Sequence, residues 1–566
     1  MKLVIIGGVA GGASAAARAR RIDEKAEIVL IERGEHVSFA NCGLPYYIGG
    51  EIDDRDSLLV QTPRKLGRRF NLDVRCNSEA TRIFPDRHQV EVRDLIAGRT
   101  YLESYDRLIL SPGAAPFVPD IPGAGLEGVY TLRTIPDAER IRALVEREKP
   151  ATAVVAGGGF IGLEMAENLH RRGIRVHLVE MASQVMPAVD EDIAAFLHRE
   201  LRDKGVKLHL STRVEAVERD SGGLLVRLSG SEAICAGLVI LSVGVRPETR
   251  LAAGAGLALG AGGGIEVDDH LRTSDPDIYA VGDAVEVRNL VTGRKELIPL
   301  AGPANKQGRI AADNALGGRG VSFRGSLGTS IVRVFDLVLA RTGASEKQLK
   351  AESLEYLSSW THSASHASYY PGAGQISIKL TFSPVDDTLY GAQAVGRDGV
   401  DKRIDVLATA LANKMTVHEL TELDLAYAPP FGSGKDPVNM AGYVASNILN
   451  GDVAVAHWNE LNGFRDNGRL LLDVRSRPEF ALGHIPGALN IPVDELRARL
   501  AELDPDRETV AYCRVGVRAY IACRILAQQG FGRVRNLSGG YVTYSTAAPG
   551  DTTSALERES LLQGQE

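Results

Sequence analysis

The sequence predicts a multidomain α/β protein, and three observations support this prediction. Two βαβ segments with glycine-rich turns begin near Leu3 and Thr152, about 150 residues apart. After Gly325, alternating apolar stretches followed by a helical segment indicate an α+β domain, and from about Leu471 a new β–α rhythm indicates a further small α/β domain. A chain of 566 residues is also far longer than one hydrophobic core usually serves.

Composition narrows the class of protein. The chain is 44% hydrophobic and 24% charged with a net charge of -7, which is typical of a soluble globular protein and shows no electrostatic demand for nucleic acid. Five scattered cysteines do not make a secreted disulfide scaffold and fit a reducing compartment. The first apolar run stops at Gly7 without a cleavage-type sequence, and no window approaches the ~20 apolar residues of a membrane span. We therefore expect a cytoplasmic protein without membrane insertion.

The first βαβ segment has most parts of a dinucleotide site. Glycines between a strand and a helix let the backbone approach a pyrophosphate, and an acid after the next strand binds ribose hydroxyls. Gly7 and Gly12 are present, Val9 occupies the middle position of G-x-G-x-x-G, and Glu32 follows twenty residues after Gly12. The predicted elements are a strand at Leu3–Ile6, a helix at Ala13–Arg21 and a strand at Glu27–Ile31.

The second βαβ segment carries the complete motif. Gly157, Gly159 and Gly162 are spaced as G-x-G-x-x-G, and Glu180 stands eighteen residues after Gly162 at the end of the next strand. An acid there repels a 2′-phosphate, so NADH is favoured over NADPH. Either glycine cluster alone could be only a tight turn, but two in one chain favour two dinucleotide sites.

A third segment, TSDPDIYAVGD, ends in Gly282 and Asp283. It resembles the T-x5-Y-A-x-G-D segment of flavoprotein reductases with two dinucleotide-binding domains, in which the aspartate binds the flavin ribityl chain. The resemblance implies FAD and NADH as cofactors. The cofactor-binding residues predicted in this way are Gly7, Gly8, Ala10, Gly11, Gly12, Glu32, Arg33, Asn41, Gly157, Gly159, Phe160, Ile161, Gly162, Glu180, Gly244, Asp283 and Ala301.

Cys42 is the first candidate for catalysis. It lies ten residues after Glu32 in SFANCGLPYYIGG, and no second cysteine is close in sequence. A lone redox cysteine must pair with a substrate sulfur or with an oxygen species. Its reactivity requires a lowered thiol pKa, which a helix N-terminus or an electropositive flavin edge can provide. The alternative is a small buried apolar residue.

The segment around Cys42 closely resembles the coenzyme A disulfide reductase and NADH oxidase or peroxidase group, in which the matching cysteine is redox-active. By this resemblance Ser38 and Asn41 flank the reactive site. The resemblance also implies that three residues of the first helix contact coenzyme A, although a solvated basic helix face is the alternative. These residues are Ser14, Arg18 and Arg21.

Two tyrosine-containing segments match the same group: HASYYPG with Tyr369 and Tyr370, and LAYAPPFGSGKD with Tyr427. In that group, tyrosines of the partner subunit approach the cysteine and can donate protons. We predict Tyr370 and Tyr427 as catalytic residues of a homodimer. The sequence does not decide between Tyr369 and Tyr370, and a packing role is the alternative.

A second reactive cysteine is predicted in CRVGVR, between a strand and a helix. Such a loop directs backbone N–H groups at the sulfur of Cys513, and Arg514 and Arg518 add positive charge, so a thiolate or persulfide is stabilised. Together with LLDVR and GHIPGALNIP, the loop resembles a rhodanese domain. The remaining three cysteines are predicted to be packing residues, namely Cys76, Cys235 and Cys523.

The predicted fold class is therefore an α/β flavoprotein with two dinucleotide-binding domains, an α+β dimerisation domain and a C-terminal rhodanese-like α/β domain. The predicted limits are 1–119 and 246–324 for FAD binding, 120–245 for NAD binding, 325–450 for dimerisation, 451–468 for a linker, 469–549 for the rhodanese domain and 550–566 for a disordered tail.

The predicted function is an FAD-dependent NADH:persulfide or polysulfide reductase that releases sulfide from coenzyme A persulfide or similar thiol persulfides. It should also reduce coenzyme A disulfide. Persulfides are favoured because a sulfur-carrying domain serves no purpose for a plain disulfide. One alternative is an NADH oxidase or peroxidase that uses a sulfenic acid at Cys42. The other is a sulfurtransferase acting through Cys513, and no metal site is predicted.

Overall fold

The computed structural model describes residues 1–220, 223–230, 232–461 and 468–548. The chain forms two compact units, the first made of Met1–Val185 and Gly205–Gly328, the second of Met186–Lys204 and Thr329–Glu566. The predicted disordered tail at 550–566 lies outside the described residues. Within the part that is described, no helix is long and apolar enough to cross a membrane.

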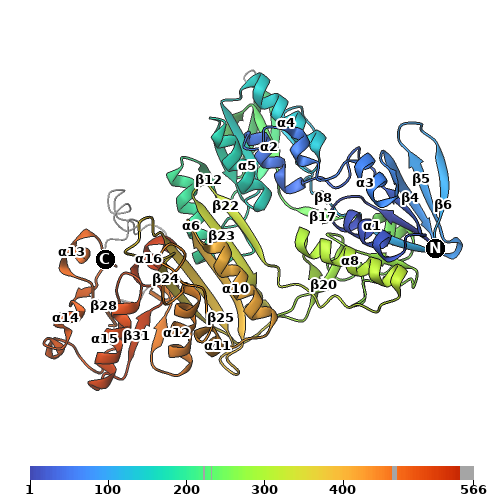
Figure 1. The fold of residues 1–566 in the computed structure, drawn as a ribbon. Coiled ribbons are helices and arrows are strands. Elements are labelled where there is room, and N and C mark those ends of the chain that lie inside the picture. The colour runs from blue at the N-terminus through green and yellow to red at the C-terminus, as the bar shows by residue number, and fades with distance from the viewer. Residues whose placement is uncertain (221–222, 231, 462–467, 549–566) are drawn as a thin grey trace. The chain divides into compact units, whose positions relative to one another are not determined.

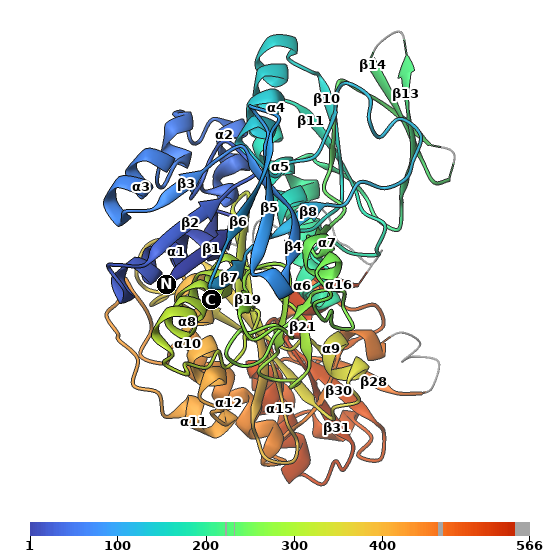
Figure 2. The same ribbon diagram turned by 90° about the vertical axis from the view of Figure 1, so that its right-hand side faces the viewer.

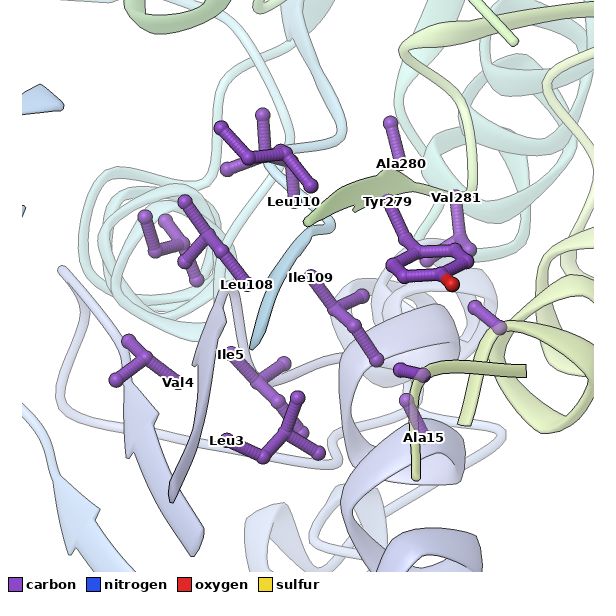
Figure 3. Close-up of a cluster of buried hydrophobic side chains, with 14 of the residues drawn as sticks. Leu3, Val4, Ile5, Ala15, Leu108, Ile109, Leu110, Tyr279, Ala280 and Val281 are labelled. Atoms are coloured by element: carbon purple, nitrogen blue, oxygen red, sulfur yellow. The ribbon is translucent and has the colours of Figure 1, made fainter. Parts of the chain in front are cut away.

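The first unit contains a five-stranded parallel sheet that begins with the N-terminal strand. Its order is β19-β7-β1-β2-β3, with bounds Ile278–Ala280, Arg107–Leu110, Lys2–Ile6, Glu27–Ile31 and Asp73–Arg75. Buried side chains from distant parts of the sequence meet beneath it, among them Leu3, Ile109 and Tyr279 (Figure 3). Residues 278–280 therefore complete a sheet that begins at the N-terminus.

Helix α1 (Ala10–Ile22) joins β1 to β2 and packs side by side with α8 (Ala301–Gly317), as Figures 1 and 2 show. The approach is too close for larger residues. A Cβ on Gly308 would lie 2.1 Å from the carbonyl oxygen of Gly11, and one on Gly12 would lie 1.8 Å from that of Gly7. Gly308 is therefore required by the packing of α8 against α1, and Gly12 by the close approach of α1 to the turn at Gly7.

The second sheet of this unit is also parallel. Its order is β12-β11-β10-β16-β9, with bounds Lys207–His209, Arg175–Val179, Thr152–Ala156, Leu238–Leu241 and Val129–Tyr130. Helix α5 (Phe160–Arg171) joins β10 to β11, so both predicted βαβ segments are present. A three-stranded antiparallel sheet follows, with strands β13 (Val214–Asp220), β14 (Gly223–Leu228) and β15 (Ala233–Ala236). Cys235 is exposed on β15, so its predicted packing role was wrong.

An antiparallel five-stranded sheet organises the first part of the second unit. Its order is β22-β23-β26-β25-β24, with bounds Ser330–Val334, Leu337–Gly343, Leu389–Gly396, Gln375–Phe382 and Leu357–Ala364. Helix α10 (Val400–Ala412) contacts β23 and β26, and α12 (Pro437–Leu449) contacts β24 and β25. This arrangement confirms the predicted α+β character.

Helix α6 (Glu191–Asp203) lies inside the range predicted for NAD binding, but residues 186–204 belong to the second unit. Buried charges explain the attachment. The ammonium group of Lys379 is 3.1 Å from Asp190 and 2.9 Å from Asp192, and 3.1 Å from Glu346. A buried ammonium requires such partners, because an unpaired buried charge costs several kcal/mol or more. The carboxylates raise the pKa of Lys379 against the effect of its burial, which is the largest single influence.

The C-terminal sheet is parallel. Its order is β27-β31-β30-β28-β29, with bounds Ala454–Ala456, Val534–Leu537, Thr509–Tyr512, Leu470–Asp473 and Leu489–Asn490. Residues 454–456 were predicted to lie in a linker, but they form the edge strand β27 because their backbone pairs with β31. Residues 462–467 of that predicted linker lie outside the described residues. Three helices matter for the site: α13 (Arg477–Leu482), α15 (Val517–Gln528) and α16 (Gly540–Ala547).

Candidate active sites

Cys42 lies at the centre of a short 3-10 turn, Asn41–Gly43, that leads directly into α2 (Leu44–Gly49). Pro45 in the first turn of α2 favours helix initiation because its fixed φ suits that position. The Cys42 backbone N–H donates a hydrogen bond to Asn41 Oδ1 at 3.1 Å, and the sulfur is 3.7 Å from the same oxygen. The side chain is exposed, so the thiol is accessible at the start of a helix, as the sequence predicted.

The charges around Cys42 do not favour the thiolate. Partial desolvation is the largest effect and raises the pKa of the Cys42 thiol, and the carboxylates of Glu164 and Asp283 raise it further. Arg133 opposes them. The expected lowering of this pKa is therefore not produced by the protein's own groups, since two nearby negative charges outweigh one positive charge.

Asp283, which was predicted to bind the flavin ribityl chain, is one of the charges that act on Cys42. It follows Gly282, whose φ of +86° is available mainly to glycine, and its carboxylate is 3.6 Å from the guanidinium of Arg133. Burial raises the pKa of Asp283, and Arg133 acts in the opposite direction. Neither Arg133 nor Glu164 belongs to a recognisable motif, and both come from positions distant in the chain, so the sequence alone does not single them out.

The first glycine turn has the geometry of a dinucleotide site. Gly7 has φ +94°, and a Cβ there would lie 2.0 Å from the carbonyl oxygen of Ser111. The carboxylate of Glu32 accepts hydrogen bonds from the backbone N–H groups of Gly8 and Gly34, both at 2.8 Å. Helix α1 begins at Ala10 with no acidic residue in its first turn, so its N-terminus suits a pyrophosphate.

The second glycine turn repeats this arrangement. Gly157 has φ +103°, and its Cβ would lie 2.3 Å from the carbonyl oxygen of Ser242. A Cβ on Gly159 would meet no described protein atom within 4 Å, so packing does not require that glycine and approach to a ligand explains it. Glu180 accepts hydrogen bonds from the backbone N–H groups of Gly158 at 2.6 Å and Ala182 at 2.8 Å. The carboxylate is held beside the turn, the position of a ribose-binding acid in a dinucleotide site.

The remaining predicted cofactor residues lie around these turns. Phe160 and Ile161 are the first residues of α5, and Ala301 is the first residue of α8. Gly244 has φ +112°, and its carbonyl accepts a hydrogen bond from the Phe117 N–H at 2.9 Å. The guanidinium of Arg33 is largely exposed and is 3.8 Å from Glu248.

The residues predicted to contact coenzyme A have partners within the protein. Ser14 donates a hydrogen bond to Asn305 on α8 at 2.5 Å. Arg18 makes a 2.6 Å ion pair with Asp313, a buried residue that also lies on α8. Part of their role is therefore to join α1 to α8.

Arg21 and Ser38 are placed differently. The Arg21 Nε donates to the carbonyl of Ala17 at 2.9 Å, and its side chain is exposed at the end of α1. Ser38 has φ +51°, an unusual backbone conformation for a residue other than glycine, and its N–H donates to the carbonyl of Gly8 at 2.8 Å. Ser38 thus connects the first glycine turn to the segment that leads to Cys42.

In the second unit, the structure pairs Tyr369 rather than Tyr370 with Tyr427. The two hydroxyl oxygens are 3.0 Å apart, and this hydrogen bond raises the pKa of Tyr369. Tyr370 instead packs edge-on against His366 with ring centres 5.9 Å apart. All three tyrosines are exposed. The catalytic role of Tyr370 stays a prediction, and Tyr369 is the residue whose hydroxyl contacts that of Tyr427.

Cys513 directly follows β30 and is the first residue of the predicted loop. Its sulfur accepts a hydrogen bond from the backbone N–H of Gly516 at 3.1 Å, and Arg518 also hydrogen bonds to it. The side chain of Cys513 is 1% exposed, so the thiol is enclosed by the loop. Desolvation lowers the pKa of Arg514. The predicted sulfur-binding loop is present in the structure with two hydrogen-bond donors on the sulfur.

Glu479 is a functional candidate that sequence reasoning missed. Arg518 donates two hydrogen bonds to its carboxylate, both at 2.7 Å. Burial opposes ionisation, but Arg518 and the capping Ser476 hold the pKa of Glu479 at about 2. The carboxylate thus orients Arg518 toward Cys513. The capping-box pattern Ser-x-x-Glu was visible in the sequence, but it predicts only a helix start.

Comparisons with known proteins agree with this arrangement. Residues 1–308 match the profile of the pyridine nucleotide-disulphide oxidoreductases. The chain belongs to the pyridine nucleotide-disulphide oxidoreductase family. Residues 329–436 match the dimerisation domain of the same family, and residues 457–547 match the rhodanese-like domain. The predicted fold class, the flavoprotein oxidoreductase family and the C-terminal rhodanese domain are thereby confirmed.

Several relatives of this oxidoreductase are similar over most of their length. A coenzyme A disulfide reductase from Staphylococcus haemolyticus is 34% identical over 447 residues, 79% of this chain and 100% of that protein. The crystal structure of reduced Bacillus anthracis CoADR-RHD has a TM-score of 0.95 and 49% identity, covering 97% of this chain and 98% of that one. An NAD-dependent persulfide reductase from A. fulgidus has a TM-score of 0.91 and 39% identity, covering 96% and 100%.

Proposed function

We propose that this oxidoreductase is an FAD-dependent NADH:persulfide or polysulfide reductase that also reduces coenzyme A disulfide. The observation that carries the proposal is that one chain contains both an accessible lone thiol, Cys42, and an enclosed thiol, Cys513, in a rhodanese domain. The similarity to a coenzyme A disulfide reductase and to an NAD-dependent persulfide reductase supports the same substrate class.

The two glycine turns fit the two cofactors. Gly7 and Glu32 would hold the pyrophosphate and ribose of FAD, with Asp283 on its ribityl chain, because the turn leaves no room for a side chain and the carboxylate is fixed. Gly159 and Glu180 would hold NADH in the same way, and the Glu180 carboxylate would repel the additional phosphate of NADPH. FAD, when bound, supplies two electrons taken from NADH.

The chain's own chemistry is centred on Cys42. Its thiolate attacks the thiol sulfur of a persulfide, so that an S–S bond forms between Cys42 and the carrier and hydrosulfide leaves with the sulfane sulfur. Two electrons and a proton then return this mixed disulfide to the Cys42 thiolate and the free carrier thiol. Asn41 Oδ1, which accepts from the Cys42 N–H, keeps the thiol at the start of α2 during both steps.

The substrate site is completed by the carrier and by a second subunit. On α1, Arg18 and Arg21 supply positive charge for the phosphates of coenzyme A and Ser14 supplies a hydroxyl, with Ser38 near the thiol end. The dimerisation domain supports a homodimer in which tyrosines of one subunit serve the thiol of the other. We favour the hydrogen-bonded pair Tyr369 and Tyr427 as proton donors to the leaving sulfur.

The C-terminal domain supplies sulfane sulfur. Cys513 would carry it as a persulfide, because the Gly516 N–H and the Arg518 guanidinium stabilise negative charge on the sulfur. Transfer to a thiol carrier regenerates the Cys513 thiolate and creates the persulfide that Cys42 consumes. Arg514, beside Cys513 in the same loop, adds positive charge for an anionic donor.

The decisive test compares Cys42→Ser with the wild-type holoenzyme. Sulfide release from coenzyme A persulfide or glutathione persulfide with NADH should vanish in the variant, because no mixed disulfide can form. Sulfurtransferase activity through Cys513 should stay unchanged in the same preparation. Sulfide release by Cys42→Ser at the wild-type rate would contradict the proposal. Faster turnover of peroxide or oxygen than of every sulfur substrate would favour the oxidase or peroxidase alternative.

A further inference from the structure

Strand β24 of the dimerisation domain contacts the rhodanese domain directly. Trp360 and His362 alternate with Thr361 along the strand, so both project from the same face. The Trp360 backbone N–H donates a hydrogen bond to Ser538 Oγ at 3.1 Å, and His362 Nε2 is 2.9 Å from Thr543 Oγ1. Two hydrogen bonds therefore join β24 to the turn and helix that follow β31.

The start of α16, directly after this turn, also hydrogen bonds to the main chain of the Cys513 loop. The backbone N–H of Tyr541 donates to the carbonyl of Cys513 at 2.8 Å, and that of Val542 donates to the carbonyl of Arg514 at 3.0 Å. Helix α16 is thus bonded to the loop main chain through its first turn, which also includes Thr543.

Two adjacent glycines, Gly539 and Gly540, allow the turn to pack closely against both β24 and the cysteine loop. A Cβ on Gly540 would lie 2.6 Å from the carbonyl oxygen of Cys513, and one on Gly539 would lie 2.0 Å from Thr543 Oγ1 and 3.0 Å from Trp360 Cβ. Both have positive φ, +72° for Gly539 and +58° for Gly540. Strand β24, the turn at Gly539 and Gly540, and the cysteine loop are therefore packed too closely to admit a side chain at either glycine.

His362 is held at both ring nitrogens. Its Nδ1 is 2.7 Å from Ser377 Oγ on β25, and its Nε2 faces Thr543. Desolvation is the largest effect and lowers the pKa of His362 to about 3; a hydrogen bond to the backbone of Gly539 opposes it, and the charge of Arg514 acts in the same direction as desolvation. The imidazole is neutral at physiological pH, so one nitrogen donates and the other accepts, and the ring cannot turn without losing a hydrogen bond.

We propose that His362 is a positioning residue for Cys513: it fixes α16 through Thr543, and α16 fixes the main chain of the cysteine loop. The Gly516 N–H and the Arg518 guanidinium then stay directed at the sulfur. The dimerisation domain thereby helps to stabilise negative charge on Cys513, the proposed persulfide carrier of the rhodanese domain. This inference rests on the proposed role of Cys513 as a sulfur carrier.

The test uses the full-length holoenzyme and a matched set of variants. Thr543→Val removes the hydroxyl and keeps the shape, whereas Thr543→Ser keeps the hydroxyl. His362→Gln can replace the Nε2 contact and His362→Ala cannot. Ser377→Ala is the control, because it removes the Nδ1 partner and leaves the contact with α16.

The readouts are kcat and KM for sulfur transfer from thiosulfate to cyanide, with their pH profiles, and NADH-dependent reduction of coenzyme A disulfide. Thr543→Val and His362→Ala should lower the sulfurtransferase kcat about tenfold, the effect of about one hydrogen bond. They should also move the acidic limb of the profile to higher pH. Thr543→Ser, His362→Gln and Ser377→Ala should stay close to wild type, and disulfide reduction should be unchanged throughout.

Two outcomes would overturn the inference. Thr543→Val with the wild-type kcat and pH profile would show that the contact is only packing. A loss that is equal in both activities would show general damage to the fold. If the wild type itself lacks sulfurtransferase activity, the role of Cys513 fails instead, and the pH dependence of Cys513 alkylation, followed by mass spectrometry, still reports whether Thr543→Val changes the thiol.

Discussion

The two candidate reactive cysteines have opposite surroundings. Cys42 is exposed, and the nearest charges that act on it include two carboxylates, Glu164 and Asp283, which raise its pKa. Cys513 is 1% exposed, and its sulfur is bonded by a backbone N–H and by Arg518. One thiol lies at an open helix start, and the other is enclosed in a cradle of donors.

This difference in surroundings suits the two thiols to different proposed roles. A cradle of donors stabilises a stored anionic sulfur without help, which suits a carrier that must hold a persulfide between partners. An exposed thiol that the protein does not hold as a thiolate must receive that stabilisation from a bound cofactor or substrate, so its reactivity is coupled to their presence. The comparison thus predicts that changes at Cys513 act on sulfur transfer and that changes around Cys42 act on reduction.

The largest separation should come from Cys513→Ser. Removing the sulfur removes the site of the covalent intermediate, so sulfurtransferase activity should fall by at least ~10³-fold. Reduction of small thiol persulfides by NADH should stay near wild type because Cys42 is untouched. Both activities are measured in one preparation. A parallel collapse of both would break the division of labour between the two thiols.

A smaller effect is expected from Arg518→Ala. A hydrogen bond to a charged group contributes about 1.5–3 kcal/mol, so sulfurtransferase kcat/KM should fall about 10- to 100-fold. Part of this loss comes from the Glu479 carboxylate, which would be left without its guanidinium partner.

Two controls sharpen the Arg518 prediction. Arg518→Lys keeps the charge but not the two-pronged geometry, so it should recover part of the activity. Arg518→Ala combined with Glu479→Gln should recover part as well, because the uncompensated negative charge is removed. If Arg518→Ala is as active as wild type, the cradle around Cys513 does not depend on this guanidinium.

The smallest predicted effect is at the other thiol. Glu164→Gln removes a negative charge that raises the pKa of Cys42, so this pKa should fall and the thiolate fraction at neutral pH should increase. The rate of Cys42 alkylation, followed from pH 6 to pH 10, should therefore rise at lower pH than in wild type. Tyr46→Phe is the control, since it removes the hydroxyl 3.4 Å from Glu164 and leaves the charge. An alkylation profile identical to wild type would show that Glu164 does not act on the thiol.

Local elements were largely predictable from the chain. The strand at Glu27–Ile31 has the predicted bounds, and the helix predicted at Ala13–Arg21 is present but begins three residues earlier, at Ala10, and ends at Ile22. The reason is that short strands and single helices follow from patterns within a few residues. The cysteine loop at 513–518 was predictable on the same grounds, since all its donors are adjacent in sequence.

Contacts between distant segments were not predictable in this way. Nothing in the sequence around Asp192 indicates that its helix packs with Lys379. The choice of Tyr369 over Tyr370 as the partner of Tyr427 depends on which side chain a loop directs outward. Such pairings are decided by the packing of whole elements, which no local pattern contains.

The sequence by itself determined the family and the two glycine turns and singled out the two candidate cysteines, because each depends on residues close together in the chain. Only the tertiary structure decided what surrounds each thiol: Glu164 and Arg133 beside Cys42, and the contact of His362 with α16 behind Cys513. The physical reason is that a thiol's pKa depends on charges and donors within a few ångströms, and in a folded chain those come from residues tens to hundreds of positions away.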